Sequence, residues 1–126
     1  MKGGGNGGGA TVAVAVAVGL VLLSEMLGFG AAMSCTQVYN RLYPCEPFVV
    51  KGGPPAPSPA CCAGMRAVKN LIPTTNDRRQ ACTCLKHLGN EFRDRVNFGA
   101  AALLPRMCGV EFGFPISMAT MCNRIP

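Results

Sequence analysis

The stretch "PACCAGM", residues 59–65, places Cys61 and Cys62 next to each other. Adjacent thiols are too constrained to pair readily with one another, so their side chains reach toward two partners, toward a metal, or toward nothing. The chain of 126 residues holds eight cysteines in all, more than a cytosolic enzyme usually carries. The other six cysteines, and the compartment in which the chain folds, therefore decide what this doublet does.

The first 32 residues differ in character from the rest of the chain. A single early charge, Lys2, precedes an apolar run from Ala10 to Leu23, and Gly30 and Ala32 stand at the two small-residue positions of a cleavage site. This is the layout of a secretory signal peptide, and it predicts cleavage after Ala32. The alternative is a retained membrane anchor, but the apolar run is shorter than the roughly 20 residues that a spanning helix needs.

Residues 33–126 would form the mature chain, and they contain all eight cysteines. An even number of cysteines in a short secreted chain indicates a disulfide framework. A zinc site built from the cysteine clusters is the weaker alternative, and a redox enzyme would need a C-x-x-C motif that the chain lacks. His87 is the single histidine and has no nucleophile motif nearby, so we interpret it as an exposed helix residue.

Periodicity in residues 33–126 predicts an all-α domain of four short helices followed by an irregular tail. Apolar residues and cysteines recur at helical spacing from Cys35 to Cys45, from Cys61 to Ile72 and from Ala81 to Leu88. Ser34 with Gln37, and Thr74 with Asp77, are positioned to cap the first and third helices. Pro44 and Pro47 are expected to bend the first helix near its end, and Gly89 is expected to stop the third. A fourth helix is expected to begin at Asn97 and to stop at Pro105.

The composition leaves open whether the core is filled. Small apolar side chains dominate and tryptophan is absent, so four cross-links could hold the helices apart around a cavity; a small, well-packed core is the alternative. The net charge of +6 favours acidic partners such as anionic lipid surfaces. Basic residues are not clustered with aromatic ones, which argues against nucleic-acid binding. Arg93 and Arg95 form either a solvated loop face or a docking point on an anionic surface.

The order of the eight cysteines is C, C, CC, CxC, C, C, with gaps of 9, 15, 19, 1, 23 and 13 residues. This order resembles the eight-cysteine motif of plant non-specific lipid-transfer proteins of type 1, in the prolamin superfamily. The stretch "TTNDR", residues 74–78, is similar to the family's T-x-x-D-R pentapeptide, and Thr83 is polar between the paired cysteines, as in type 1 members. The family's second pentapeptide, P-Y-x-I-S, is replaced here by "GFPIS", residues 113–117.

Eight cysteines allow 105 disulfide pairings, and sequence alone cannot choose one of them. The resemblance implies the pairs Cys35–Cys84, Cys45–Cys61, Cys62–Cys108 and Cys82–Cys122. It implies that residues 33–126 form a lipid-transfer domain in which four helices surround an elongated apolar cavity. The function implied is that of a monomeric, secreted carrier of fatty acids and phospholipids that contacts anionic membranes transiently. Such a carrier acts in the extracellular space or cell wall and needs neither a cofactor nor a catalytic residue.

Ten residues are expected to contact the lipid. The resemblance places Arg78 near one mouth of the cavity, where its planar guanidinium, which stays charged, would hold the head group; the alternative is that Arg78 pairs with Asp77 or caps the helix. The expected cavity lining, some of which could instead be helix–helix core, consists of Val38, Leu42, Met65, Val68, Leu85, Leu88, Leu103, Phe114 and Ile116. Phe114 lacks the hydroxyl of the family's tyrosine, which predicts a looser head-group preference.

Two other functions remain open on the same cysteine scaffold. An inhibitor of digestive enzymes would need a rigid exposed loop, for which residues 52–60 are the candidate. A cationic defence protein that disturbs membranes is compatible with the net charge. Seed storage is disfavoured, because the chain contains only two glutamines.

Overall fold

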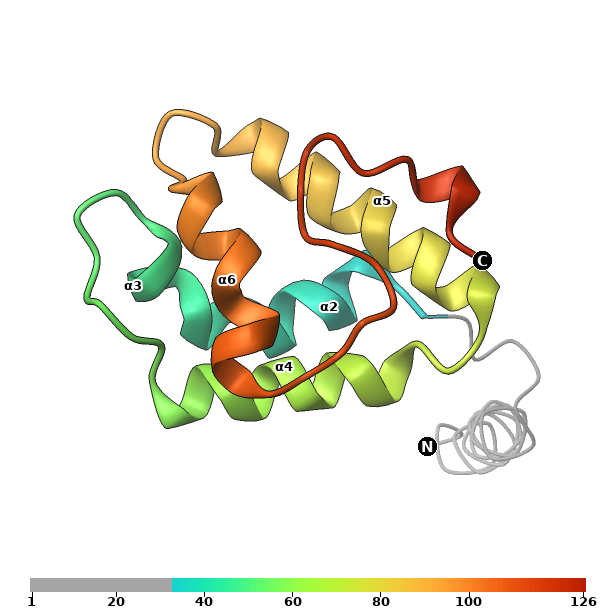
Figure 1. The fold of residues 1–126 in the computed structure, drawn as a ribbon, viewed down its shortest axis with the longest axis horizontal. Coiled ribbons are helices and arrows are strands. Elements are labelled where there is room, and N and C mark those ends of the chain that lie inside the picture. The colour runs from blue at the N-terminus through green and yellow to red at the C-terminus, as the bar shows by residue number, and fades with distance from the viewer. Residues whose placement is uncertain (1–32) are drawn as a thin grey trace, which may run out of the picture. The chain divides into compact units, whose positions relative to one another are not determined.

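Five α-helices form the frame of the described chain, which is residues 33–126 of the computed structural model (Figure 1). They are α2 (Cys35–Leu42), the single-turn α3 (Glu46–Val49), α4 (Pro59–Leu71), α5 (Thr75–Glu91) and α6 (Phe98–Cys108). Two short 3-10 helices, η1 (Tyr43–Cys45) and η2 (Cys122–Arg124), complete the elements. The predicted all-α class is confirmed: α2, α4, α5 and α6 are the four helices, followed by a largely irregular tail. The predicted signal peptide, residues 1–32, lies outside the described residues.

Local capping fixes where the helices begin. Ser34 and Gln37 form a reciprocal capping box at α2, with nitrogen–oxygen distances of 3.2 and 3.0 Å, and Thr74 with Asp77 does the same at α5. The Asn97 side chain accepts a hydrogen bond from the Ala100 amide and begins α6. Each cap satisfies a backbone donor that the first helical turn leaves free. These three starts are as predicted.

The prolines after α2 bend the chain, as expected. The α-helix stops at Leu42, η1 contains Pro44, and α3 begins at Glu46 with Pro47 in its first turn. Proline lacks an amide donor, so it is accommodated in a tightened turn or at the start of a new helix. The result is a short step in the chain that places α3 beside α6 (Figure 1).

Two predicted helix ends are wrong. Helix α5 does not stop at Gly89 but continues to Glu91. A Cβ at Gly89 would approach Met118 Sδ to 3.0 Å and Phe98 Cε1 to 3.2 Å, so this glycine permits close packing and does not cap the helix. Helix α6 likewise continues through Pro105 to Cys108 and ends at Gly109, whose φ of 65° is the left-handed conformation that favours glycine.

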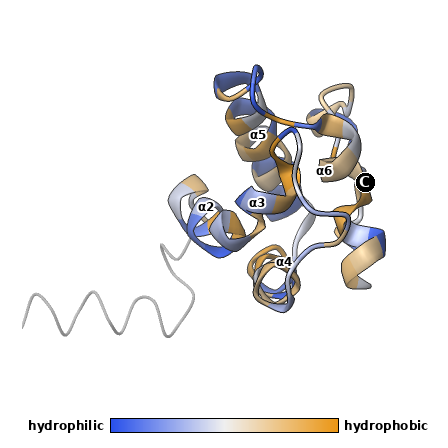
Figure 2. Cartoon of the chain, turned by 90° about the vertical axis from the view of Figure 1, so that its left-hand side faces the viewer, coloured by the Kyte–Doolittle hydropathy of each residue, from blue (hydrophilic) through white to orange (hydrophobic). Residues whose placement is uncertain are grey.

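Four disulfides join the helices, in the same pairs that the family resemblance implies. Cys35–Cys84 joins α2 to α5, Cys45–Cys61 joins η1 to α4, Cys62–Cys108 joins α4 to α6, and Cys82–Cys122 joins α5 to the tail. The adjacent cysteines of α4 therefore bind partners on two different elements. Figure 2, which looks nearly along α4, shows α5 and α6 above that helix and α2 to one side.

Close contact between α2 and α4 depends on one small residue. Gly64 is buried in α4, and a Cβ there would collide with the backbone carbonyl of Arg41 in α2. The backbones of α2 and α4 are therefore in close contact at Gly64. Helices α5 and α6, in contrast, lie far enough from them to leave a cavity. Among residues 33–126, no helix is both long and apolar enough to cross a bilayer.

Candidate functional site

An internal cavity of about 360 Å³ lies between α2, α3, α4, α5, α6 and the tail. Its wall is mainly aliphatic and aromatic, with the disulfide residues Cys45 and Cys82 also on it. The volume falls in the range of pockets that bind small organic molecules. The composition therefore favours an apolar ligand, because few polar groups are available to satisfy a polar one.

Six of the expected lining residues do line this cavity. They come from three helices and the tail, and they are Leu42, Met65, Leu85, Leu88, Phe114 and Ile116. Met65 and Phe114 are almost fully buried, with 0% and 7% of their surface exposed, and the other four are partly buried. The sequence thus predicted the inward faces of α4 and α5 and the tail residues that close the cavity.

Three other expected lining residues lie elsewhere. Val38 and Val68 have no exposed surface and belong to the core, because their sides of α2 and α4 meet another helix and no void. Leu103 is 46% exposed on the outer face of α6, and its neighbour Leu104 lines the cavity instead. Successive residues of an α-helix point about 100° apart, so Leu104 faces inward where Leu103 faces outward.

Arg78 does not line the cavity. Its guanidinium donates hydrogen bonds to the Pro73 carbonyl at 3.1 Å, the Thr75 hydroxyl at 3.0 Å and the Pro126 carbonyl at 3.4 Å. Its aliphatic stem packs against Gly113, where a Cβ would lie 3.1 Å from Arg78 Cδ. The side chain therefore holds the start of α5 and the tail together.

Exposed residues on the cavity wall mark where the cavity meets the surface, and we divide them into two groups. We define the α3 opening by Tyr43, Glu46, Phe92 and Arg95, all exposed, with Tyr43 at 71%. We define the tail opening by Phe98, Pro115 and Ser117, which are also exposed. Other side chains on the wall, such as Met65 and Leu104, are buried. The sequence did not predict the α3 opening. The one related expectation was the alternative that Arg95 docks on an anionic surface.

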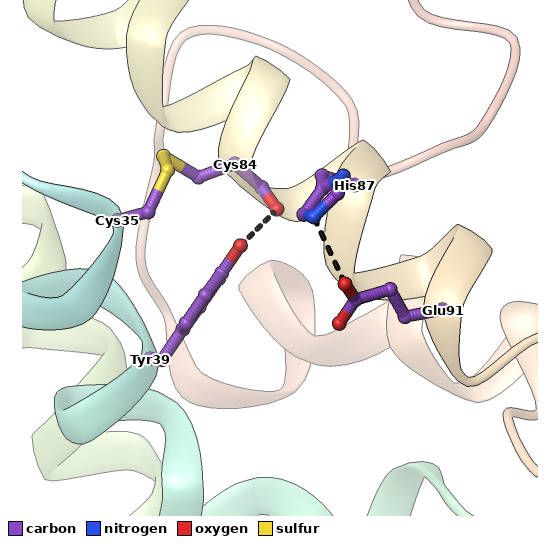
Figure 3. Close-up of polar contacts among 5 residues, drawn as sticks. All are labelled: Cys35, Tyr39, Cys84, His87 and Glu91. Carbon is purple, nitrogen blue, oxygen red and sulfur yellow. Dashed lines mark hydrogen bonds and ion pairs between the residues drawn. A yellow bond between two sulfur atoms is a disulfide. The ribbon is translucent and has the colours of Figure 1, made fainter.

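Tyr39 lies on the cavity wall and makes one of the polar contacts drawn in Figure 3. The Tyr39 hydroxyl donates to the Cys84 carbonyl at 3.2 Å, and burial, followed by the negative charge of Glu91, raises the pKa of Tyr39. His87 is exposed on α5, as expected, and its Nε2 atom lies 3.0 Å from the carboxylate of Glu91 one turn along. Within residues 33–126, no three His, Cys, Asp or Glu side chains converge on a possible metal position.

The fold and cavity define a class: a small helical protein, braced by four disulfides, with an apolar interior that is open to the surface. The chain belongs to the protease inhibitor/seed storage/LTP family, whose sequence model matches residues 35–123. Membership covers the whole helical frame and most of the tail.

Two relatives and one solved structure show what this chain is similar to within the family. The non-specific lipid-transfer protein of Apium graveolens is 42% identical over 93 residues, covering 74% of this chain and 76% of that protein. The stigma/stylar cysteine-rich adhesin of Lilium longiflorum is 42% identical over 106 residues, covering 84% and 91%. The structure of non-specific lipid transfer protein 1 from barley in complex with lysophosphatidylcholine has a TM-score of 0.67 and 35% identity, covering 75% of this chain and all of that one. The resemblance to lipid-transfer proteins is confirmed.

Proposed function

We propose that this protein is a carrier that binds acyl lipids in its cavity and transfers them between membranes or to the cell wall. Fatty acids, phospholipids and lysolipids are the proposed cargo. The observation that carries the proposal is the apolar cavity of about 360 Å³, which two openings connect to the surface. A related structure holds lysophosphatidylcholine on the same fold, which supports an acyl chain as the ligand.

The free energy of binding would come from removing the acyl chain from water. Each CH2 group that leaves water contributes about 0.8 kcal/mol, so a long chain gains roughly 10 kcal/mol before costs. Ordering the chain and losing its freedom of motion cancel much of that gain, and micromolar affinity is the expected result. Because this term depends on apolar length and little on shape, the carrier should accept many acyl lipids.

Transport of this kind makes and breaks no covalent bond, so we propose that the protein is a carrier and not an enzyme. Leu42, Met65, Leu85, Leu88 and Ile116 would contact the acyl chain. The ring of Phe114, which lies 5.9 Å from that of Phe112, would close the cavity on the tail side.

We also propose a secreted, monomeric protein of the extracellular space or cell wall that touches anionic membranes transiently. The signal-like residues 1–32 and the net charge of +6 support this. The absence of free cysteines among the described residues is consistent with folding in an oxidising compartment.

Displacement of a fluorescent fatty acid from the oxidised protein tests the function. Saturable binding at one or two sites is expected, and mass spectrometry of the natively secreted protein should find bound acyl lipids. Ala101→Phe, which fills space in the cavity wall, should weaken binding, whereas Leu103→Phe on the exposed side of α6 should not. A protein that is recovered empty and takes up no acyl chain would contradict the proposal and favour an inhibitor or a membrane-disturbing defence protein.

A further inference from the structure

We propose that the α3 opening is the head-group site of this carrier, and that Arg95 on its rim binds the carboxylate or phosphate of the carried lipid. The inference rests on the proposed carrier function and assigns the polar end of the cargo to one end of the cavity. It places the head group away from Arg78, the residue that the family resemblance implied.

The backbone fixes Arg95 beside α3. The Lys51 amide donates to the Arg95 carbonyl at 2.9 Å, and the Asn97 amide donates to the Val49 carbonyl at 2.7 Å. An isolated β-bridge between Val50 and Val96 lies between these two hydrogen bonds. The turn after α5 is thus tied to the end of α3 by backbone contacts at Arg95 itself and at the two residues that follow it, so Arg95 has a defined place on the rim.

The guanidinium of Arg95 is available to a ligand. It lies 4.9 Å from the centre of the Phe92 ring, and it makes no hydrogen bond or ion pair with another described residue. Stacking on an aromatic ring holds the guanidinium plane while leaving its N–H edges free. Those edges fit a carboxylate or phosphate with two parallel hydrogen bonds.

The other basic groups near the cavity are already engaged. Lys86 also lines the cavity, but its ammonium donates to the Thr120 carbonyl at 2.9 Å. Arg78 donates to three oxygens of the chain, as described above. Of the two basic side chains on the cavity wall, Arg95 is therefore the one that makes no hydrogen bond or ion pair with another described residue.

One acidic group shares the opening with Arg95. Glu46 is the only carboxylate on the cavity wall, and its oxygens lie more than 4.0 Å from the Arg95 nitrogens, because the described residues contain a single ion pair at His87. An incoming anion would be attracted by Arg95 and repelled by Glu46. The two side chains should therefore have opposite effects on the affinity for anionic lipids.

The test compares lauric acid with lauryl alcohol, which have the same acyl length but differ in charge, on the full oxidised protein. Arg95→Gln should weaken lauric acid binding about fivefold, as expected of a solvent-exposed ion pair, and leave lauryl alcohol within twofold. Glu46→Gln should strengthen lauric acid binding by about twofold, and both effects should shrink at high salt. Acetate, which has the carboxylate without the chain, should not compete at millimolar concentration.

Arg93→Gln is the matched control, since Arg93 lies in the same turn, does not line the cavity, and donates to Asn90 Oδ1 at 2.7 Å. It should leave the ratio of acid to alcohol affinity unchanged. Circular dichroism and the melting temperature establish that each variant is folded. The inference is overturned if Arg95→Gln does not change that ratio, or if Arg78→Gln changes it instead. If the wild-type protein binds neither lipid, the proposed carrier function itself fails.

Discussion

Arginine is used in different ways near the C-terminus and at the α3 opening of the cavity. Near the C-terminus, Arg78 and Arg79 of α5 donate hydrogen bonds to the carbonyls of Pro126 and Ile125, which ties the tail to α5. At the α3 opening, Arg95 stacks on Phe92 and keeps its donors free. The same side chain is structural where the chain satisfies its donors and is suited to binding where it does not. This difference can be tested at each end.

The largest effect should come from freeing the tail. Cys82→Ala with Cys122→Ala removes a cross-link between residues 40 apart, and restricting a loop of that length stabilises a protein by about 4 kcal/mol. Cys45→Ala with Cys61→Ala, close to the α3 opening, removes one between residues 16 apart, worth about 3 kcal/mol. Urea unfolding of each oxidised variant measures both losses.

The tail variant should also bind acyl lipids less tightly, because Phe114 and Ile116 would no longer be held against the cavity. A greater loss of stability from the Cys45–Cys61 change would contradict the expectation that the cross-link closing the longer loop stabilises the protein more.

The arginines should give the next largest difference. Arg78→Gln combined with Arg79→Gln removes four hydrogen bonds, and we expect a loss of about 1–2 kcal/mol of unfolding free energy. Arg95→Gln should change it by less than about 0.5 kcal/mol, as is usual for an exposed residue. Thermal unfolding compares the two. Equal losses at both ends would show that Arg95 is as structural as the tail arginines.

A hydroxyl at the tail end should reduce the contrast between the ends. Phe114 has no group that can hydrogen-bond a head group, and Phe114→Tyr would supply one worth about 1 kcal/mol, or roughly fivefold in affinity. Affinities for a lysophospholipid and a fatty acid should then depend less on Arg95, which a double-mutant cycle measures. If Phe114→Tyr leaves both affinities unchanged, the predicted looseness of head-group preference is wrong.

Much of the frame could be predicted because its signals are local. The cap pairs Ser34–Gln37 and Thr74–Asp77 are three residues apart, and the cysteine order is a property of the sequence alone. The errors arose where distant contacts decide. Gly89 looks like a stop until Met118 and Phe98 are seen packed against it, and α6 accommodates Pro105 within a helix that Gly109 ends.

The candidate site could be predicted only in part, for a related reason. Periodicity finds the buried side of a helix, but it does not say whether that side meets another helix, as at Val38 and Val68, or a cavity, as at Leu85 and Leu88. The availability of Arg95 depends on where a turn is tied to α3 by backbone hydrogen bonds, which no local pattern encodes.

The smallest effect should come from Tyr39, which lies on the cavity wall outside both openings. Its raised pKa means that the folded state keeps the phenol proton more tightly than the unfolded chain. This contribution to stability is therefore complete below the unfolded pKa of about 10 and is lost as the pH rises through the folded value.

Tyr39→Phe should cost about 1 kcal/mol at neutral pH, because the hydrogen bond to Cys84 is lost, and should flatten the decline in stability above about pH 10. Urea unfolding at several pH values measures the loss of stability and its pH dependence. Tyr43→Phe is the control, because Tyr43 is 71% exposed. Because Tyr39 belongs to neither end, the acid-to-alcohol ratio should stay constant in this variant; a changed ratio would place the head group in the middle of the cavity.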